Sequence, residues 1–148
     1  MKIWIKEDRT AKEMEVRIVC KKRDAAVEAL ARQIGRAAGT VEGLWEQRVY
    51  QLPLQSIYYA ESVDGKTFLY TGEKVFLAKE SLLTLERRVG QSGFARISKS
   101  CLVNLNYLNC VAPYANHRLL AELENGECLI VGRTYIDQLK TKLKGDRL

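Results

Sequence analysis

Hydrophobic and polar residues alternate in short runs over most of this chain. From Trp45 onward the runs are separated by turn-forming residues about every 8 to 12 positions, which is typical of an all-β domain. Asp64-Gly65 and Asn125-Gly126 are hairpin dipeptides, because their second residue readily adopts a positive φ. The pattern predicts strands at 45–52, 57–61, 67–71, 74–78, 109–114, 118–124 and 127–132.

Two stretches of the same region space their apolar residues as a helix does. Glu80–Val89 places Leu82, Leu85 and Val89 on one face, and a glycine follows it. Thr134–Lys144 has an apolar stripe of its own and ends in lysines, whose charge suits a helix C-terminus. The sequence therefore predicts one internal and one C-terminal helix.

The first 44 residues have a different pattern of hydrophobic and polar positions. Alternating runs at Lys2–Lys6 and Glu15–Lys21 predict a β-hairpin, and Asp24–Ala38 reads as a helix with Asp24 at its N-cap. A unit of two strands and one helix is marginally stable alone. We therefore expect it to dock on the rest of the chain or on a second protomer.

Length and composition limit the chain to one domain, or to one domain with a small subdomain. The 148 residues are 47% hydrophobic, which is an ordinary supply for a globular core. The apolar runs are far shorter than the roughly 20 residues of a membrane-spanning helix, and the N-terminus lacks the apolar stretch of a signal peptide. We expect a cytoplasmic protein of mainly β (α+β overall) class, with a β-β-α dimerisation or regulatory subdomain at 1–44 and an antiparallel β domain at 45–148.

The charge balance favours a polyanionic partner. The 24 Lys and Arg outnumber the 18 Asp and Glu, so the formal net charge is +6. Four cysteines without a CxxC pair and a single histidine make a metal site improbable, and the cysteines read as free thiols. We expect no cofactor and no metal.

No motif for catalysis emerges from the sequence. The chain has no GxSxG, P-loop, GxGxxG or HExxH pattern, and His117 lies in a hairpin-like turn between Asn116 and Arg118. Glu122 and Glu124 share one face of a strand, which is typical of a solvated face. We therefore expect a non-enzymatic protein without a small-molecule substrate.

The segment Gly93–Leu105, "GFARISKSCLVNL", carries the most distinctive chemistry. An aromatic residue precedes alternating basic and hydroxyl residues, and an apolar strand then ends in Asn104. Guanidinium, ammonium and hydroxyl donors on a short irregular stretch anchored by core residues can reach phosphate oxygens and base edges. The alternative for this segment is a merely solvated loop.

This segment resembles the most recognisable stretch of the LytTR family of bacterial DNA-binding domains, F-x-R-x-x-[basic or polar]-S-x-[aliphatic]-V-N-[aliphatic]. The blocks at 57–71, 76–89 and 123–143 resemble the family's strand-turn-strand opening, its helix and its closing strand with arginine and helix. The resemblance covers about residues 45–144. The matching positions are Phe94, Arg96, Lys99, Ser100, Leu102, Val103, Asn104 and Leu105.

The resemblance implies an elongated antiparallel β fold in which loops between strands, rather than a recognition helix, enter the DNA major groove. Carried over by position, it implies base contacts from Lys66, Lys99 and Arg133 and DNA backbone contacts from Arg96 and Ser100. Arginine can donate two hydrogen bonds to guanine O6 and N7, and lysine presents a point charge. Phe94, Val103 and Asn104 are expected to be structural, with Asn104 stabilising its own turn.

The implied function is a sequence-specific transcriptional regulator that binds double-stranded DNA, as a homodimer at paired direct repeats. Relatives often carry histidine or asparagine where this chain has Lys66 and Lys99, so their base sequence does not transfer. The first 44 residues are too few for a phosphoryl-receiver domain, and the chain resembles stand-alone LytTR proteins, often paired with a small integral-membrane protein.

Three alternatives remain open from the sequence. One is an RNA-binding or translation-associated basic β domain, although no strand carries the aromatic pair of an RNP motif. Another is a small catalytic or ligand-sensing β domain. A redox role for Cys101, Cys110 or Cys128 is the third, because these cysteines fall near the proposed binding face.

Overall fold

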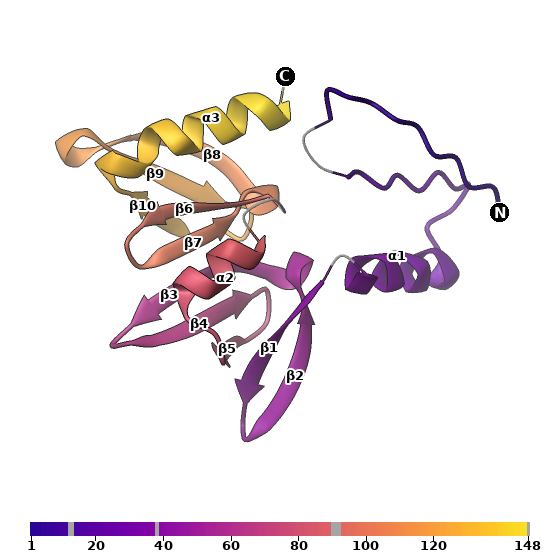
Figure 1. The fold of residues 1–148 in the computed structure, drawn as a ribbon, viewed down its shortest axis with the longest axis horizontal. Coiled ribbons are helices and arrows are strands. Elements are labelled where there is room, and N and C mark those ends of the chain that lie inside the picture. The colour runs from indigo at the N-terminus through magenta and orange to yellow at the C-terminus, as the bar shows by residue number, and fades with distance from the viewer. Residues whose placement is uncertain (12–13, 38, 90–92, 148) are drawn as a thin grey trace.

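A computed structural model describes residues 1–11, 14–37, 39–89 and 93–147. The chain forms a long helix near its N-terminus, then two antiparallel sheets with one helix inserted between strands and one at the C-terminus (Figure 1). This architecture confirms the mainly β fold class. The predicted end of the first helix at Ala38 and the glycine after Val89 lie outside the described residues.

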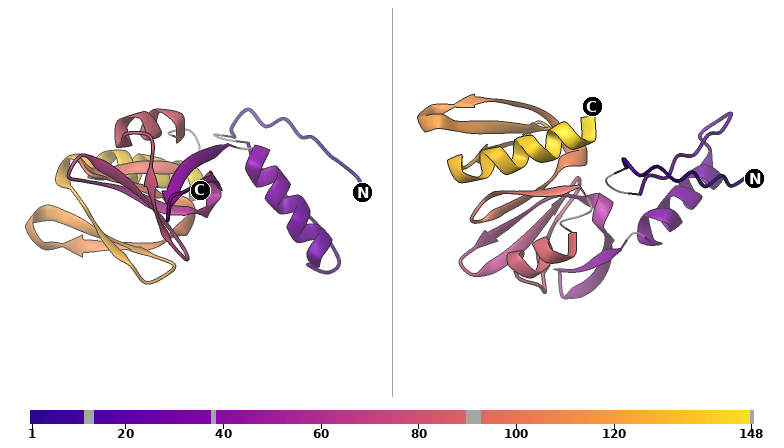
Figure 2. Two further views of the ribbon diagram at one scale, coloured as in Figure 1. Left: turned by 90° about the horizontal axis from the view of Figure 1, so that it is seen from below. Right: turned by 45° about the horizontal axis from the view of Figure 1, so that its top comes forward.

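The N-terminal helix α1 (Ala25–Ala37) forms as predicted. The Asp24 carboxylate accepts a hydrogen bond from the Val27 N–H at 3.0 Å, as an N-cap residue does. The two strands predicted before it do not form: residues 1–11 and 14–23 contain no strand. In Figures 1 and 2 this N-terminal segment and α1 stand to one side of both sheets.

Seven strands form the larger sheet, in the order β2-β1-β5-β4-β3-β7-β6, and all neighbours are antiparallel. Its helix α2 (Leu82–Val89) follows β5, within the range predicted for it. The strands are β1 (Thr40–Trp45), β2 (Arg48–Pro53), β3 (Ile57–Val63), β4 (Lys66–Thr71), β5 (Val75–Ala78), β6 (Phe94–Ser98) and β7 (Cys101–Asn104).

The smaller sheet has the order β10-β9-β8 and is also antiparallel. A short 3-10 turn, Arg133–Tyr135, connects its last strand to the C-terminal helix, so that helix begins two residues later than predicted. The elements are β8 (Leu108–Tyr114), β9 (Arg118–Leu123), β10 (Cys128–Val131) and α3 (Ile136–Arg147).

The central strands β3, β6 and β7 are buried on both faces. One face contributes Ala60 and Leu102 to a core that includes Leu85 of α2. The other contributes Val103 to a second core that includes Leu139 of α3. Because successive strand side chains point to opposite faces, a strand between two cores is apolar at consecutive positions, which explains the buried run of residues 101–105.

Two expectations about this region are corrected. The segment 93–100 is not irregular, because β6 and β7 form an antiparallel hairpin around a short turn. The proposed boundary between residues 44 and 45 falls inside β1, which pairs with β2 and β5. Gly43 permits that pairing, since a Cβ there would lie 2.7 Å from Leu52 Cδ1 and 2.8 Å from Phe76 Cβ.

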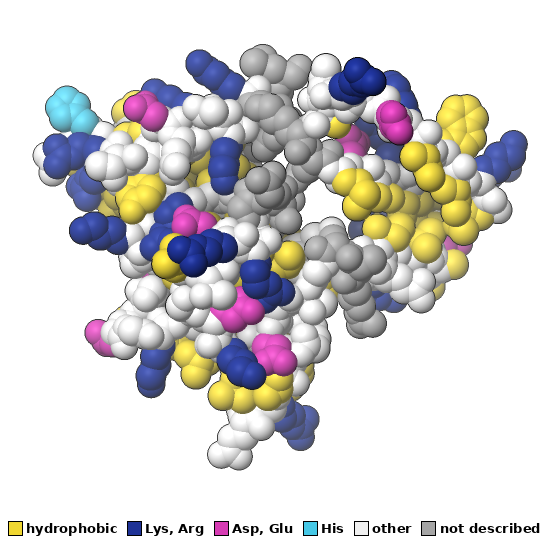
Figure 3. All heavy atoms as spheres, in the orientation of Figure 1, with side chains coloured by type: hydrophobic (Ala, Val, Ile, Leu, Met, Phe, Trp, Pro, Cys, Tyr) yellow, Lys and Arg dark blue, Asp and Glu magenta, His cyan; other side chains and the backbone are white. Residues whose placement is uncertain are grey.

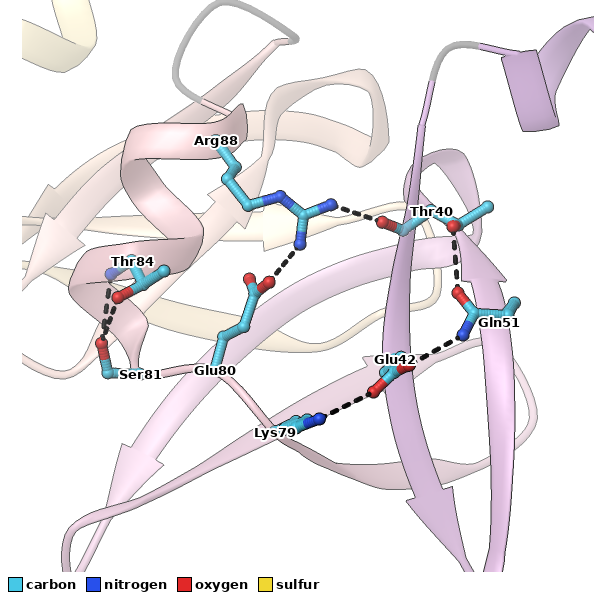
Figure 4. A network of polar contacts seen from close by, with 8 residues as sticks. All are labelled: Thr40, Glu42, Gln51, Lys79, Glu80, Ser81, Thr84 and Arg88. Carbon is cyan, nitrogen blue, oxygen red and sulfur yellow. Dashed lines mark hydrogen bonds and ion pairs between the residues drawn. The ribbon is translucent and has the colours of Figure 1, made fainter.

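A network of polar contacts ties α2 to β1 and β2 (Figure 4). The Arg88 guanidinium donates hydrogen bonds to the Glu80 carboxylate and to the Thr40 carbonyl oxygen. On the β1–β2 ladder, Gln51 Nε2 donates to Glu42 at 3.1 Å. The network fixes the first strand of the sheet immediately after the N-terminal region.

Candidate nucleic-acid interface

Three turns and one helix start lie on the same side of the molecule. In Figures 1 and 2 the β3–β4 turn, the β6–β7 turn, the β8–β9 turn and the start of α3 all lie opposite α1 and the N-terminal segment. Lys66 begins β4, Lys99 lies between β6 and β7, and Arg133 directly precedes α3. The fold therefore brings the three predicted base-contact residues to one side.

Lys66 is presented by a tight hairpin turn. Val63 pairs with Lys66 across two residues, Asp64 at φ 52° and Gly65 at φ 78°. Positive φ at both central positions is the requirement of a type I′ turn, whose twist matches the flanking strands. Thr67, which follows, is buried, so the exposed Lys66 side chain leaves the molecule from a fixed backbone.

Arg96 organises the turn that carries Lys99. Its Nε donates to the Ser98 carbonyl at 2.8 Å, its Nη2 donates to the Lys99 carbonyl, and its Nη1 lies 3.5 Å from the Glu86 carboxylate. The side chain is only 18% exposed. The Arg96 guanidinium therefore holds the turn by its backbone carbonyl groups, while the Lys99 side chain faces solvent.

Ser98 and Ser100 complete this turn. The Ser100 N–H donates to Ser98 Oγ at 3.2 Å, and the two hydroxyl oxygens lie 3.4 Å apart. The Ser100 carbonyl accepts a hydrogen bond from the Ser62 N–H at 2.8 Å, which links the turn to β3. Ser100, predicted as a DNA backbone contact, is half-buried within these contacts.

The three motif residues expected to be structural are buried. Phe94 and Val103 belong to the two cores, at 2% and 0% exposure. Asn104 Oδ1 accepts from the Asn106 N–H and its Nδ2 donates to the Ile57 carbonyl, both at 3.0 Å. Asn104 thus stabilises its own turn, as the sequence indicated, and also joins β7 to the start of β3.

Arg133 is anchored by the backbone on both sides of it. The Gly132 N–H donates to the Ile97 carbonyl of β6 at 2.8 Å, and the Tyr135 N–H donates to the Gly132 carbonyl at 3.0 Å. The Arg133 side chain is exposed. Within the described parts of the chain, neither Arg133 nor Lys66 nor Lys99 makes a side-chain hydrogen bond or ion pair, so all three can receive an anion or a base edge.

Arg133 also lines a hollow of about 810 Å³ between the β8–β9 turn and α3, together with Arg118 and Lys140. Arg118 is held there, because its Nε donates to the Ala115 carbonyl at 3.0 Å and its guanidinium lies 5.1 Å from the Tyr114 ring centre. This cluster is not apparent from the sequence, because its residues are far apart along the chain. Its one local signal was a basic residue beside a hairpin turn.

The turn beside this hollow has an unusual backbone. Asn116 and His117 both have positive φ, at 59° and 60°, which is uncommon for residues other than glycine. His117 is exposed at the tip, as the sequence indicated. Figure 3 shows Lys and Arg side chains recurring along the left side, where these turns lie.

Two of the three thiols near these loops, those of Cys101 and Cys110, have raised pKa values. Burial raises the pKa of Cys101 from its ordinary value of 9.0 to about 12. Cys110 donates a hydrogen bond to the Glu122 carboxylate at 3.1 Å, and this contact raises the pKa of its thiol. Because the thiolate is the reactive form, both surroundings disfavour oxidation.

Among the described residues, neither a metal-ligand cluster nor a membrane-spanning helix is found. No group of three or more His, Cys, Asp and Glu side chains is arranged to hold a metal ion in these ranges. The helices in the same ranges are all too short or too polar to cross a membrane.

The family model of the LytTr DNA-binding domain matches residues 47–144, and the chain therefore belongs to the LytTR family. The LytTr DNA-binding domain of a putative methyl-accepting/DNA response regulator from Bacillus cereus has the same fold. It superposes with a TM-score of 0.67 at 24% identity, over 71% of this chain and 97% of that domain.

Curated relatives match about two thirds of the chain. The sensory transduction protein LytT of Bacillus anthracis is 27% identical over 99 residues, which are 67% of this chain and 40% of LytT. The transcriptional regulatory protein YpdB of Escherichia coli strain K12 is 26% identical over 95 residues, 64% of this chain and 39% of YpdB. The chain thus spans about two fifths of the length of these relatives.

Proposed function

We propose that this protein is a transcriptional regulator that binds double-stranded DNA sequence-specifically through its inter-strand loops. The observation that carries the proposal is the presence of Lys66, Lys99 and Arg133 on separate, internally braced turns on one side of a LytTR domain. All three side chains are exposed and without a partner in the described residues. The names of the relatives, transcriptional regulatory protein among them, support the same function.

The three side chains enter the major groove and contact bases. Arg133 donates two hydrogen bonds to guanine O6 and N7, while each lysine donates to a single acceptor. Arg118 and Lys140 beside Arg133 neutralise adjacent phosphates, which fixes the orientation of the domain on the duplex. Arg96 and Ser100, predicted as DNA backbone contacts, hold the Lys99 turn in place and so position it against the DNA backbone.

The protein binds paired direct repeats as a homodimer, with one domain on each repeat. Two linked domains bind two sites far more tightly than one domain binds one, because the second contact is intramolecular. The resemblance to stand-alone LytTR proteins adds a small integral-membrane protein as a candidate regulatory partner. Loss of reporter control when a neighbouring membrane-protein gene is deleted would test that partner.

The test is a fluorescence titration of the full chain on duplex DNA from the region upstream of its own gene. Scrambled duplex and RNA of matched sequence serve as competitors, at several salt concentrations. If about six phosphates are neutralised, log K falls with log salt at a slope near −5, from roughly −0.9 per phosphate. Specific, salt-dependent binding that survives both competitors supports the proposal.

The contrary outcomes are distinct. Competition by RNA as strong as by the specific duplex would favour the RNA-binding alternative. Affinity that does not change with salt would overturn the phosphate-neutralising interface. A library of duplexes selected by the protein separates a wrong choice of promoter from a lack of specificity, since only the first yields an enriched sequence.

A further inference from the structure

The N-terminal segment exposes many large apolar side chains. Trp4 is 91% exposed, Ile5 92% and Val19 89%. Figure 3 shows hydrophobic side chains gathered on the right of the molecule, over α1 and this segment. A contiguous apolar surface on a folded protein marks a contact with another molecule.

The backbone of the same segment makes few hydrogen bonds within its described residues. Across the described residues 1–11 and 14–23, the single hydrogen bond between backbone groups joins the Ala11 N–H to the Asp8 carbonyl, in a turn. Extended backbone with free N–H and C=O groups is a template for a further strand. The chemistry of the missing partner is therefore that of an extended chain with apolar side chains on one face.

The second run of this segment, Glu15–Lys21, has a charge pattern that is complementary to that of a second copy. When two copies pair antiparallel about Val16, Glu15 lies opposite Arg17 of the second copy and Arg17 opposite its Glu15. Met14 and Ile18 face each other on the apolar side in the same register. Within one chain Glu15 and Arg17 lie 3.2 Å apart with side chains 73% and 78% exposed, so both charges are accessible to a second copy.

We propose that a second copy of this chain docks on the N-terminal segment, pairing about Val16 to build one antiparallel sheet from both copies. The first extended run of each copy flanks the central pair, which gives four strands. A single hairpin is marginal in water, but a sheet of three or more strands with a covered apolar face is stable. This requirement explains why the two strands predicted here do not form within one chain.

Helix α1 supplies the cover for that sheet. Its apolar residues Val27, Leu30 and Ile34 repeat at helical spacing and are only half-buried in the single chain. Two copies of α1 lie against the apolar face of the shared sheet in the proposed dimer. A two-fold contact of this kind uses the same surface on both copies, and it does not depend on the DNA-binding proposal.

The charge pattern gives a direct test by sedimentation equilibrium of the full chain. Glu15→Arg places arginine opposite arginine, and Arg17→Glu places glutamate opposite glutamate, because each contact occurs twice. We expect either change to raise the dimer Kd about tenfold or more, since like charges directly across a strand pair repel. The double variant restores opposite charges and is expected to return the Kd to within about threefold of the original.

Two further variants complete the design. Val16→Lys places two ammonium groups at the two-fold axis and is expected to abolish the dimer; Val16 is 53% exposed, so each chain still folds. Glu73→Arg makes the same charge change in an exposed turn after β4 and is expected to leave the dimer intact. A chain that stays monomeric up to millimolar concentration would overturn the proposal, as would a dimer insensitive to these changes or one that the double variant fails to restore.

Discussion

At the scale of single residues, the surroundings of a side chain decide whether its charge can serve recognition. Arg96 and Lys99 lie three positions apart in one motif. The Arg96 guanidinium donates hydrogen bonds to the Ser98 and Lys99 carbonyls, whereas the Lys99 ammonium has no partner among the described residues. Sequence alone assigns both to DNA, because a motif records residue types and not hydrogen-bond partners. Replacing any of the side chains with free donors, Lys66, Lys99 or Arg133, is therefore expected to reduce binding specificity.

Arg133→Ala is expected to weaken binding to the specific duplex by about 1 to 3 kcal/mol and to relax preference at one base pair, because a two-pronged contact to guanine is removed. Titration against a panel of single-base variants of the site measures both effects. Arg9→Ala, which removes the same charge from the N-terminal segment, is the matched control and should leave base preference unchanged. An equal loss on every sequence would place Arg133 on the phosphate backbone instead.

The buried thiol of Cys101 makes stability depend on alkaline pH. Its pKa is about 12 in the folded chain and near 9.0 when exposed, so the unfolded chain releases the proton first. The stabilising contribution is therefore complete below pH about 9 and is lost as pH rises toward about 12. Denaturant titrations between pH about 8 and about 10.5 should show a shallower fall in unfolding free energy for Cys101→Ala than for the unchanged chain.

At the scale of elements, the β6–β7 turn contains one residue that supports stability, Arg96, and one that is available for recognition, Lys99. Arg96→Ala removes charge-assisted hydrogen bonds from a largely buried side chain and should cost about 1 to 3 kcal/mol of stability. It should also weaken binding to all sequences, because the turn loses its shape. Lys99→Ala should leave stability within about 0.5 kcal/mol and reduce only specific binding. Thermal unfolding and DNA titration of both variants would contradict this division if Lys99→Ala proved the less stable.

The elements that sequence patterns predict well are those whose information is local. The β3–β4 hairpin follows from alternation around Asp64-Gly65, and α2 and α3 follow from apolar spacing. Strand β1 was not expected, because a glycine such as Gly43 weakens a strand. In the structure the side chains of Leu52 and Phe76 occupy the space that a Cβ at Gly43 would need. Strand β6 was not expected either, since burial on both faces removes the alternation that identifies a strand.

The basic hollow could not be predicted for a related reason. Arg118 and Lys140 lie on a hairpin and a helix that only the tertiary fold brings together with Arg133. By contrast, the positions of Lys66 and Lys99 at turns followed from the sequence, because hairpin dipeptides and a family motif mark them. Local pattern thus predicts where a loop lies, while the grouping of loops on one side depends on the register of both sheets.

At the scale of the whole molecule, the DNA-binding domain is expected to be stable without the N-terminal region. Every buried hydrophobic side chain among the described residues lies between Val41 and Leu139, and the network around Arg88 holds β1 from within the domain. Deleting residues 1–38 is therefore expected to change the unfolding free energy by no more than about 1 kcal/mol, or roughly 4 °C in the midpoint. Scanning calorimetry of the shortened chain measures this directly.

The same deletion should separate binding to one repeat from binding to two. Affinity for a duplex with one repeat is expected to change less than about twofold, because every proposed contact residue lies beyond residue 65. Affinity for paired repeats is expected to fall at least about tenfold, since the link between the two copies is lost. Val16→Lys in the full chain should reproduce that fall while keeping α1. Undiminished binding of paired repeats by both proteins would show that the domains associate through the DNA-binding region itself.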